Sequence, residues 1–352
     1  MSIAARRIAR ATAWACAFLL LSGAAGACWQ WLRERDDALR YPPPGRLVTV
    51  DGTRMHLDCR GTGRPLLLLE AGLTSGTSSW MRVHDALART TEVCAYDRVG
   101  IGWSDTSDAP RTPAAVAVRL HRLVGAAGLD GPYVLLGMSA GGVFVREYQA
   151  RFPQQVIGMV LVDSSHEQQL RHLPSAAADK GALRMLEACT WLQPLGVVRL
   201  LDVMAATAEG TAPDPRTGPL PAPGAVPAMV ATLNRSHACT GLQAEMEGFL
   251  GALAAAPALR PMGDLPLLVL SQDTGRPLDP AMRDDPELAA LDRALRQAWD
   301  PLQQSLARAS TRGQRQVVHG SGHLIHSDRP QAMIDAVTRF VATLRATHAG
   351  TR

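Results

Sequence analysis

One stretch of the chain decides the fold: Tyr133-Val134-Leu135-Leu136-Gly137-Met138-Ser139-Ala140-Gly141. Its first half is an apolar run of strand length, and its second half is a G-x-S-x-G pattern followed by a helix-period segment. A strand, a sharp turn at a serine and a helix form the setting that a nucleophile elbow requires. Small neighbours let the strained turn form and expose the hydroxyl. We therefore expect Ser139 to be a catalytic nucleophile.

Apolar runs recur on both sides of this stretch and alternate with helix-period segments. The predicted strands are Arg46–Val50, Met55–Cys59, Leu66–Glu70, Val93–Tyr96, Tyr133–Gly137, Val156–Asp163, Leu267–Ser271 and Gln314–Val318. The predicted helices are Trp80–Arg89, Thr112–Ala127, Gly141–Phe152, Trp299–Ala309 and Pro330–Arg345. Asp51-Gly52 is a strong hairpin signal between the first two strands. Continuous apolar strands separated by amphipathic helices predict an α/β fold, a mostly parallel sheet with helices on both faces.

The alternation stops between residues 164 and 262. This segment predicts helices around a Pro-rich loop, Thr211–Pro227. An insertion between two sheet strands at this point lies over the strand ends, so we expect a helical lid. Its Ala, Leu, Met and Pro content predicts an apolar pocket beneath it.

The N-terminus predicts a membrane anchor. Arg6, Arg7 and Arg10 precede the uncharged residues 11–32, which are long enough to cross a hydrocarbon layer. We expect this segment to stay uncleaved, with the catalytic domain outside the cytoplasm. Secretion after cleavage near Ala25-Gly26-Ala27 is the alternative, and lipidation of Cys28 is a weaker one.

These segments divide the chain into four parts. The anchor or signal segment and its linker occupy residues 1–40, and a first core part occupies residues 41–163. The lid insertion occupies residues 164–262, and a second core part occupies residues 263–346.

Composition excludes several classes of protein. The chain has 352 residues, of which 47% are hydrophobic and 19% charged, so a disordered chain is excluded. The net charge is +4 and the basic residues are scattered, so we expect no nucleic-acid partner. Because no Cys/His cluster with metal spacing occurs, we expect no metal and no cofactor. The sequence does not indicate an oligomeric state.

Four cysteines outside the anchor give two different expectations. Cys59 and Cys94 lie in strand-like runs, where a free cysteine behaves as a small buried hydrophobic residue. Cys189 and Cys239 lie in the insertion, on opposite sides of its Pro-rich loop. In an oxidising compartment this second pair forms a disulfide, whereas in the cytoplasm both remain thiols.

Two further patterns supply partners for Ser139. Gly72 follows a predicted strand, so the Leu73 N–H and the Ala140 N–H are expected to form an oxyanion hole. His323 follows Gly320-Ser321-Gly322 on a loop, where we expect it to act as general base. Its neighbours His319 and His326 compete for this role, and we interpret them as surface or structural residues.

Taken together, these motifs resemble the α/β-hydrolase superfamily, and within it the cap-bearing serine hydrolases. The matching motifs, besides the elbow, are Glu70-Ala71-Gly72, Asp97-Arg98-Val99-Gly100-Ile101-Gly102-Trp103-Ser104-Asp105, Leu161-Val162-Asp163 and Ser321-Gly322-His323. They cover residues 46–344. Many relatives carry His-Gly where this chain has Ala71-Gly72. Haloalkane dehalogenases and epoxide hydrolases of this superfamily place Asp at the elbow, so Ser139 argues against both activities.

The acid of the triad is the main departure from the family pattern. In most relatives it follows the strand that here ends near Ser271, but Gly275 stands at that position and Asp273 comes two residues early. Other relatives take the acid from the end of the preceding core strand, which here is Asp163. We favour Asp163 and keep Asp273 as the alternative.

The sequence therefore predicts a serine hydrolase that acts on a small, apolar carboxylic ester. Other serine-dependent acyl chemistry on the same fold is an alternative: amide, lactone or carbon–carbon hydrolysis, or perhydrolysis. A non-catalytic ligand-binding or signalling module is a third, because the fold alone does not fix the function.

Overall fold

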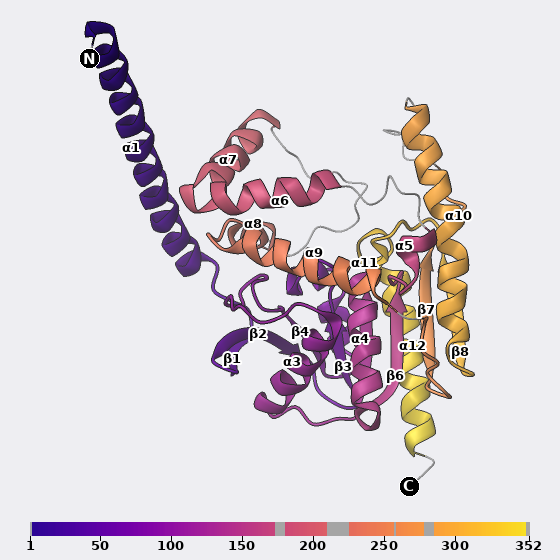
Figure 1. Cartoon of the computed structure of the whole chain (residues 1–352). Helices are drawn as coiled ribbons and strands as arrows, with labels where there is room; N and C mark the ends of the chain where they lie inside the picture. Colours follow the sequence, from indigo (N-terminus) through magenta and orange to yellow (C-terminus); the bar gives the residue numbers. More distant parts are fainter. Residues whose placement is uncertain (1, 173–179, 210–224, 257, 278–284, 350–352) are drawn as a thin grey trace.

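The computed structural model describes residues 2–172, 180–209, 225–256, 258–277 and 285–349. At its centre is an eight-stranded sheet with the order β1-β2-β4-β3-β5-β6-β7-β8 (Figure 1). The strands are β1 (Arg46–Val50), β2 (Thr53–Arg60), β3 (Leu66–Glu70), β4 (Val93–Tyr96), β5 (Tyr133–Met138), β6 (Val156–Val162), β7 (Leu267–Gln272) and β8 (Gly313–Val318).

The sheet is antiparallel at one edge and parallel elsewhere. β2 pairs with β1 and β4 in antiparallel register, whereas the pairs from β4 through β3 to β8 are parallel. The predicted hairpin joins β1 to β2: Val50 pairs with Thr53, and Asp51 and Gly52 have positive φ angles of 50° and 78°. Positive φ at both central residues is the requirement of the type I′ turn that Asp-Gly favours.

Helices cover both faces of the sheet. The core helices are α2 (His84–Ala88), α3 (Pro113–Ala126), α4 (Ala140–Arg151), α10 (Pro286–Arg308), α11 (Ile325–Asp328) and α12 (Pro330–Ala349), with 3₁₀ turns η1 (Thr77–Trp80) and η2 (Pro153–Gln155). Side chains of α3, α4 and α10 form one apolar cluster with the sheet. Side chains of α2 and α12 form a second cluster with it.

The two clusters explain the uninterrupted apolar strands. Along β3, Leu66 and Leu68 belong to the first cluster, and Leu67 and Leu69 belong to the second. Alternate residues of a strand point to opposite faces, so a strand covered on both sides has no polar face. The predicted fold class, a mostly parallel α/β-hydrolase sheet with helices on both faces, is confirmed.

Two predicted helices differ from those observed. The segment predicted as one helix over Trp80–Arg89 contains the end of η1 and the short α2. The helix predicted to begin at Trp299 begins at Pro286 instead. Asp285 caps it by accepting hydrogen bonds from the N–H groups of Glu287 and Leu288, and proline is favoured in a first helical turn.

The segment 164–262 contains five helices among its described residues: α5 (Gln169–His172), α6 (Lys180–Leu192), α7 (Val197–Glu209), α8 (Ala225–Leu233) and α9 (Ala238–Ala254), with the 3₁₀ turn η4 (Gln193–Leu195). Figure 1 shows α6 to α9 stacked over one end of the sheet. Gly241 of α9 contacts Gly100, which follows β4, so this end carries the carboxyl ends of the parallel strands. Most of the predicted Pro-rich loop lies outside the described residues.

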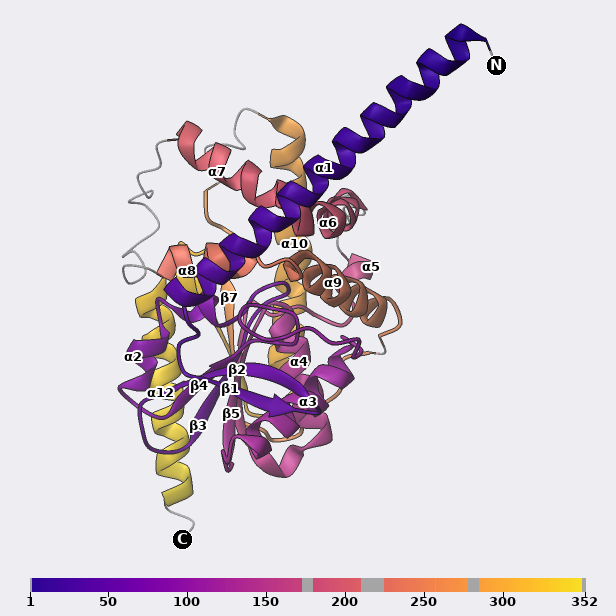
Figure 2. The same cartoon turned by 90° about the vertical axis from the view of Figure 1, so that its left-hand side faces the viewer.

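The N-terminal segment forms a helix of 38 residues, α1 (Ile3–Arg40), that is long and apolar enough to cross a membrane. Its last turns contact the helices of the 164–262 segment, whereas its N-terminal part extends away from the rest of the molecule (Figures 1 and 2).

Disulfides join both cysteine pairs outside α1. Cys189 and Cys239 are bridged, which is the outcome expected in an oxidising compartment. The expectation that Cys59 and Cys94 are free was wrong, because they too are bridged. The two residues lie directly opposite each other in the antiparallel pair β2–β4, and sequence periodicity does not reveal which strands are neighbours.

We predict that both bridges are present in the protein isolated from its native host. Alkylation of the denatured chain without reductant is expected to modify only Cys16 and Cys28, and reductant is expected to expose the other four thiols. The Cys189–Cys239 bridge closes a 50-residue interval, so its loss is expected to cost about 4 kcal/mol of unfolding free energy on the loop-entropy model. Full alkylation of Cys189 and Cys239 without reductant would contradict the prediction.

Candidate active site

Ser139 occupies a strained turn between β5 and α4. Its φ is 51° and its ψ is −123°, a conformation that places a non-glycine residue in the sparsely populated positive-φ region. The backbone packs tightly on either side: a Cβ at Gly137 would lie 2.6 Å from the Gly141 carbonyl oxygen, and one at Gly141 would lie 2.3 Å from the Glu70 carbonyl oxygen. Only glycine fits at these two positions, which explains the pattern around the serine.

The structure brings Ser139, His323 and Asp163 into one chain of hydrogen bonds. The Ser139 Oγ lies 3.0 Å from Nε2 of His323, and Nδ1 of His323 lies 2.6 Å from Oδ2 of Asp163. The His323 side chain is 41% exposed and the Asp163 side chain is fully buried. This arrangement lets the imidazole take the serine proton on one nitrogen while the carboxylate orients the other.

Asp163 is held at the carboxyl end of β6 by groups from two other elements. Its Oδ1 accepts hydrogen bonds from the Gln272 N–H at 2.9 Å and from the Trp299 indole N–H at 3.0 Å. The Trp299 ring also meets the His323 ring edge to face, with 5.9 Å between centroids. Trp299 therefore contacts both the candidate acid and the candidate base, and no sequence pattern singled it out.

The alternative acid lies elsewhere in the same loop cluster. Asp273 accepts hydrogen bonds from the N–H groups of Gly275 at 3.0 Å and Gly320 at 2.9 Å, so its carboxylate fixes the start of the histidine loop. The Gly320 N–H is the main cause that lowers the pKa of Asp273. His319, whose side chain is 89% exposed, is the imidazole near this carboxylate, at 3.7 Å.

The third histidine of the loop, His326, is buried against Trp80. Burial lowers the pKa of His326 to about 4, so this imidazole is neutral near pH 7. Its Nδ1 has no hydrogen-bond partner. The imidazole that contacts the Ser139 hydroxyl is that of His323.

The expected oxyanion donors flank Ser139. Gly72 packs beside the elbow, since a Cβ there would lie 3.5 Å from the Ser139 Cβ. Leu73 and Ala140 then belong to one apolar cluster with Val143 and Phe144 of α4 and Phe249 of α9. Their N–H groups remain the candidate oxyanion donors.

A buried ion cluster holds residues 71–75, the loop that carries the candidate donor Leu73, which we call the oxyanion loop. Arg98 donates hydrogen bonds to the carbonyl oxygens of Ala71 at 3.0 Å, Gly72 at 2.7 Å and Ser75 at 3.0 Å. Three carbonyl groups of one short loop are thus fixed by one guanidinium, which restricts the direction of the backbone at Leu73.

Two carboxylates balance the charge of Arg98. Glu70 at the end of β3 and Glu245 of α9 each lie 2.5 Å from its guanidinium nitrogens. Glu245 also accepts a 2.5 Å hydrogen bond from the Thr74 N–H, so the inserted helix α9 contacts the oxyanion loop directly. Burial raises the pKa of Glu70 to about 6, although Arg98 opposes this shift. No sequence pattern gave a role to Arg98 or Glu245. The available signal was the position of Arg98, a charged residue just after β4.

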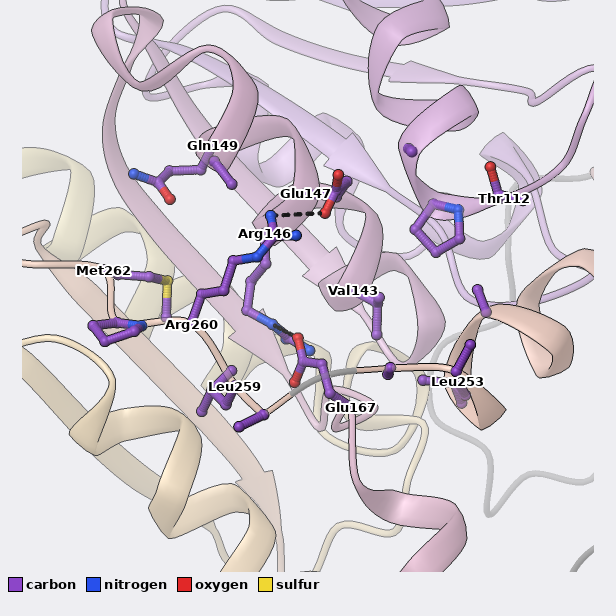
Figure 3. Close-up of a pocket in the computed structure, with 18 of the residues that line it drawn as sticks. Thr112, Val143, Arg146, Glu147, Gln149, Glu167, Leu253, Leu259, Arg260 and Met262 are labelled. Carbon is purple, nitrogen blue, oxygen red and sulfur yellow. Dashed lines mark hydrogen bonds and ion pairs between the residues drawn. The ribbon is translucent and has the colours of Figure 1, made fainter.

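A separate pocket of about 480 Å³ lies on the outer side of α4. Figure 3 shows Thr112, Val143, Leu253 and Met262 at its wall and two ion pairs beside it, Arg146–Glu167 and Arg260–Glu147. Ser139, His323 and Asp163 do not line it, so it is not the site described above.

Comparison with known proteins identifies the fold of the central part of the chain. A family model described as the alpha/beta hydrolase fold matches residues 65–187, which include the oxyanion loop and the elbow. An AB hydrolase superfamily protein of Gibberella zeae is 33% identical over 132 residues, 34% of this chain and 41% of that protein. With the sheet order and the elbow, these matches show that the chain has the α/β-hydrolase fold.

Other curated relatives match over part of their length. An uncharacterized protein of Schizosaccharomyces pombe is 30% identical over 200 residues, 48% of this chain and 36% of that protein. An uncharacterized vacuolar membrane protein of Saccharomyces cerevisiae is 35% identical over 111 residues, 30% of this chain and 17% of that protein. The chain thus spans less than half the length of these relatives.

Solved structures share the fold. An esterase from Thermogutta terrifontis superimposes with a TM-score of 0.55 at 19% identity, covering 85% of this chain and 98% of that one. An epoxide hydrolase from Bacillus megaterium superimposes with a TM-score of 0.59 at 13% identity, covering 84% of this chain and all of that one.

We predict that Asp163→Asn impairs turnover far more than Asp273→Asn. Replacing the orienting carboxylate favours the wrong histidine tautomer, and the expected loss in kcat is on the order of 10⁴-fold. Asp273→Asn, which alters only the backbone contacts of the histidine loop, is expected to cost about 10-fold or less. Steady-state kinetics of the two variants decides, and the reverse ranking would move the acid to Asp273.

We also predict that Glu245→Gln lowers kcat by about 10-fold with little change in KM. The amide retains an acceptor for the Thr74 N–H but weakens the hold on Arg98, so the Leu73 N–H is less well directed at the oxyanion. Glu247→Gln is the matched control, because Glu247 is exposed on the same helix. Equal kinetics for the two variants would exclude a positioning role for Glu245.

Proposed function

We propose that this chain is a membrane-anchored serine hydrolase that cleaves carboxylic esters. The observation that carries the proposal is the hydrogen-bonded series Ser139–His323–Asp163 on an elbow whose serine has a positive φ. In this proposal Ser139 is the nucleophile, His323 the general base and acid, and Asp163 the orienting carboxylate.

The first half of the reaction forms an acyl-enzyme. Nε2 of His323 accepts the Ser139 proton while Oγ attacks the ester carbonyl carbon, giving a tetrahedral intermediate. The N–H groups of Leu73 and Ala140 stabilise its oxyanion, and one such donor contributes about 3 kcal/mol. The intermediate then collapses: the bond to the alkoxy oxygen breaks, and His323 gives its proton to the departing alcohol.

The second half restores the enzyme. Water loses a proton to His323 and attacks the acyl carbon, and the new tetrahedral intermediate releases Ser139, which recovers a proton from His323. The net reaction converts one ester and one water into one carboxylic acid and one alcohol. The three side chains return to their starting protonation states.

The elbow residue separates this proposal from epoxide hydrolysis. Superfamily members that open epoxides attack with an elbow carboxylate, whereas this chain presents the Ser139 hydroxyl beside a histidine. A serine paired with a base is suited to acyl transfer. The candidate oxyanion donors Leu73 and Ala140 pack in an apolar cluster with Phe144 and Phe249, so the surroundings of the elbow are apolar.

Two observations support membrane anchoring, and a third supports a domain outside the cytoplasm. The helix α1 is long and apolar enough to cross a bilayer. One relative is described as a vacuolar membrane protein. The two bridged cysteine pairs favour an oxidising compartment.

We predict that Ser139→Ala and His323→Ala each abolish ester turnover without unfolding the protein. Residues that act as a unit lose most of the activity when one is removed, so each loss is expected to be on the order of 10⁴-fold or more. A panel of chromogenic esters of increasing acyl length, run on the wild type and both variants, measures this. Circular dichroism supplies the folding control.

His326→Ala is the matched variant for the choice of base. It removes a buried imidazole that does not contact Ser139, so it is expected to reduce stability more than kcat. Near-normal turnover by His323→Ala together with an inactive, folded His326→Ala would show that the base has been assigned to the wrong histidine.

A further inference from the structure

The exposed apolar side chains of this protein are concentrated in two neighbouring places. Among the described residues outside α1 and the 164–262 segment, the exposed large hydrophobic side chains are Leu288 and Leu324. The described residues from α6 to α7 expose eight, and we call them the α6–η4–α7 face: Met185, Trp191, Leu192, Leu195, Leu200, Leu201, Val203 and Met204. A patch of this kind marks an interaction surface.

Few charged residues lie in the α6–η4–α7 face. Between residues 191 and 204 the charged residues are Arg199 and Asp202. Arg199 is buried and donates to Gln30 at 2.9 Å and to Asp37 of α1 at 2.6 Å. Asp202 accepts from the Asn234 side chain at 2.9 Å. Arg199 is therefore buried and paired, and the exposed charge between residues 191 and 204 is Asp202.

The inserted segment that carries this face is docked on the anchor helix. Side chains at successive turns of α1 contact the inserted segment: buried Gln30 donates to the Asn234 carbonyl oxygen at 2.6 Å, and Glu34 accepts from the Ser236 N–H at 3.1 Å. Gly26 lies against η4, since a Cβ there would lie 2.3 Å from the Leu195 carbonyl oxygen. Positions four residues apart share one side of a helix, so one side of α1 faces this segment.

The docking point lies inside the apolar part of α1. At a rise of about 1.5 Å per residue, Gly26 lies about 9 Å before Leu32, the last residue of the uncharged segment. Trp14 and Trp31 are separated by about 26 Å along the helix, close to the thickness of a hydrocarbon layer, and tryptophans are enriched at both of its interfaces. Arg35 lies over the Trp31 ring at 4.6 Å, as expected for an interfacial pair.

We propose that the α6–η4–α7 face contacts the phospholipid bilayer that α1 crosses, with its apolar side chains in the headgroup and upper acyl region. If residues 11–32 span the membrane, then η4, which touches Gly26, lies about 9 Å inside the end of the span, at the depth of the upper acyl region. Figures 1 and 2 both show α1 extending past α6 and α7 on the side opposite the sheet, so the bilayer lies on that side. The proposal depends on the anchoring in the proposed function but not on the ester chemistry.

The test measures the membrane depth of single labelled positions in the full chain. In a Cys16→Ala, Cys28→Ala background, an environment-sensitive fluorophore is attached to one new cysteine. The protein is reconstituted in vesicles with or without a mixture of lipids brominated in the upper and in the lower acyl chain. Leu201→Cys reports the face and Leu20→Cys reports α1. Ala342→Cys, at an exposed position of α12, is the matched control.

Brominated lipid is expected to quench the Leu20 and Leu201 probes by about twofold or more and to leave the Ala342 probe unchanged, as for an apolar surface seated in the interface. Quenching at Leu20 without quenching at Leu201 would overturn the proposal and leave the face to a protein partner or a second copy of the chain. Absence of quenching at Leu20 would overturn both the proposal and the anchoring. Neither result depends on whether the enzyme hydrolyses esters.

Discussion

The backbone turn at Ser139 is the constraint on which the rest of the site depends. A serine held at a φ of 51° directs its side chain away from the sheet, and glycines at 137 and 141 let β3 and α4 approach closely enough to maintain that turn. The parallel sheet then brings the ends of β6 and β8 to the same edge, so that Asp163 and His323 arrive from distant parts of the chain. The hydrogen-bonded series Ser139–His323–Asp163 therefore depends on the carboxyl ends of these strands lying side by side.

A second constraint lies beneath the oxyanion loop. Burying Arg98 with two carboxylates is costly unless every partner is satisfied, and breaking one such pair typically costs about 3–5 kcal/mol. Here Arg98 meets Glu70, Glu245 and three loop carbonyls at once. Because Glu245 belongs to α9, the inserted helices and the oxyanion loop are mechanically joined, and the same insertion is docked on α1.

The fold, the elbow and the hairpin could be predicted from the sequence because each depends on a local pattern. Apolar runs predict the strands, glycines at fixed spacing predict the elbow, and Asp51-Gly52 predicts the hairpin. It placed Asp163 and His323 at strand ends but had no means to measure their distance. It missed the Arg98–Glu245 pair, whose members are 147 residues apart, and the Cys59–Cys94 bridge, which depends on which strands pair. Helix starts were misplaced where a cap such as Asp285 decided them.

The central claim is that Ser139 is the nucleophile, and covalent trapping tests it most directly. The full-length protein in detergent is incubated with a fluorophosphonate, digested, and mapped by mass spectrometry. The account predicts one modified peptide, carrying the phosphonyl group on Ser139, with loss of ester hydrolysis in proportion to labelling. Ester hydrolysis that persists with Ser139 unmodified, or an adduct on a different residue that tracks inhibition, would contradict it.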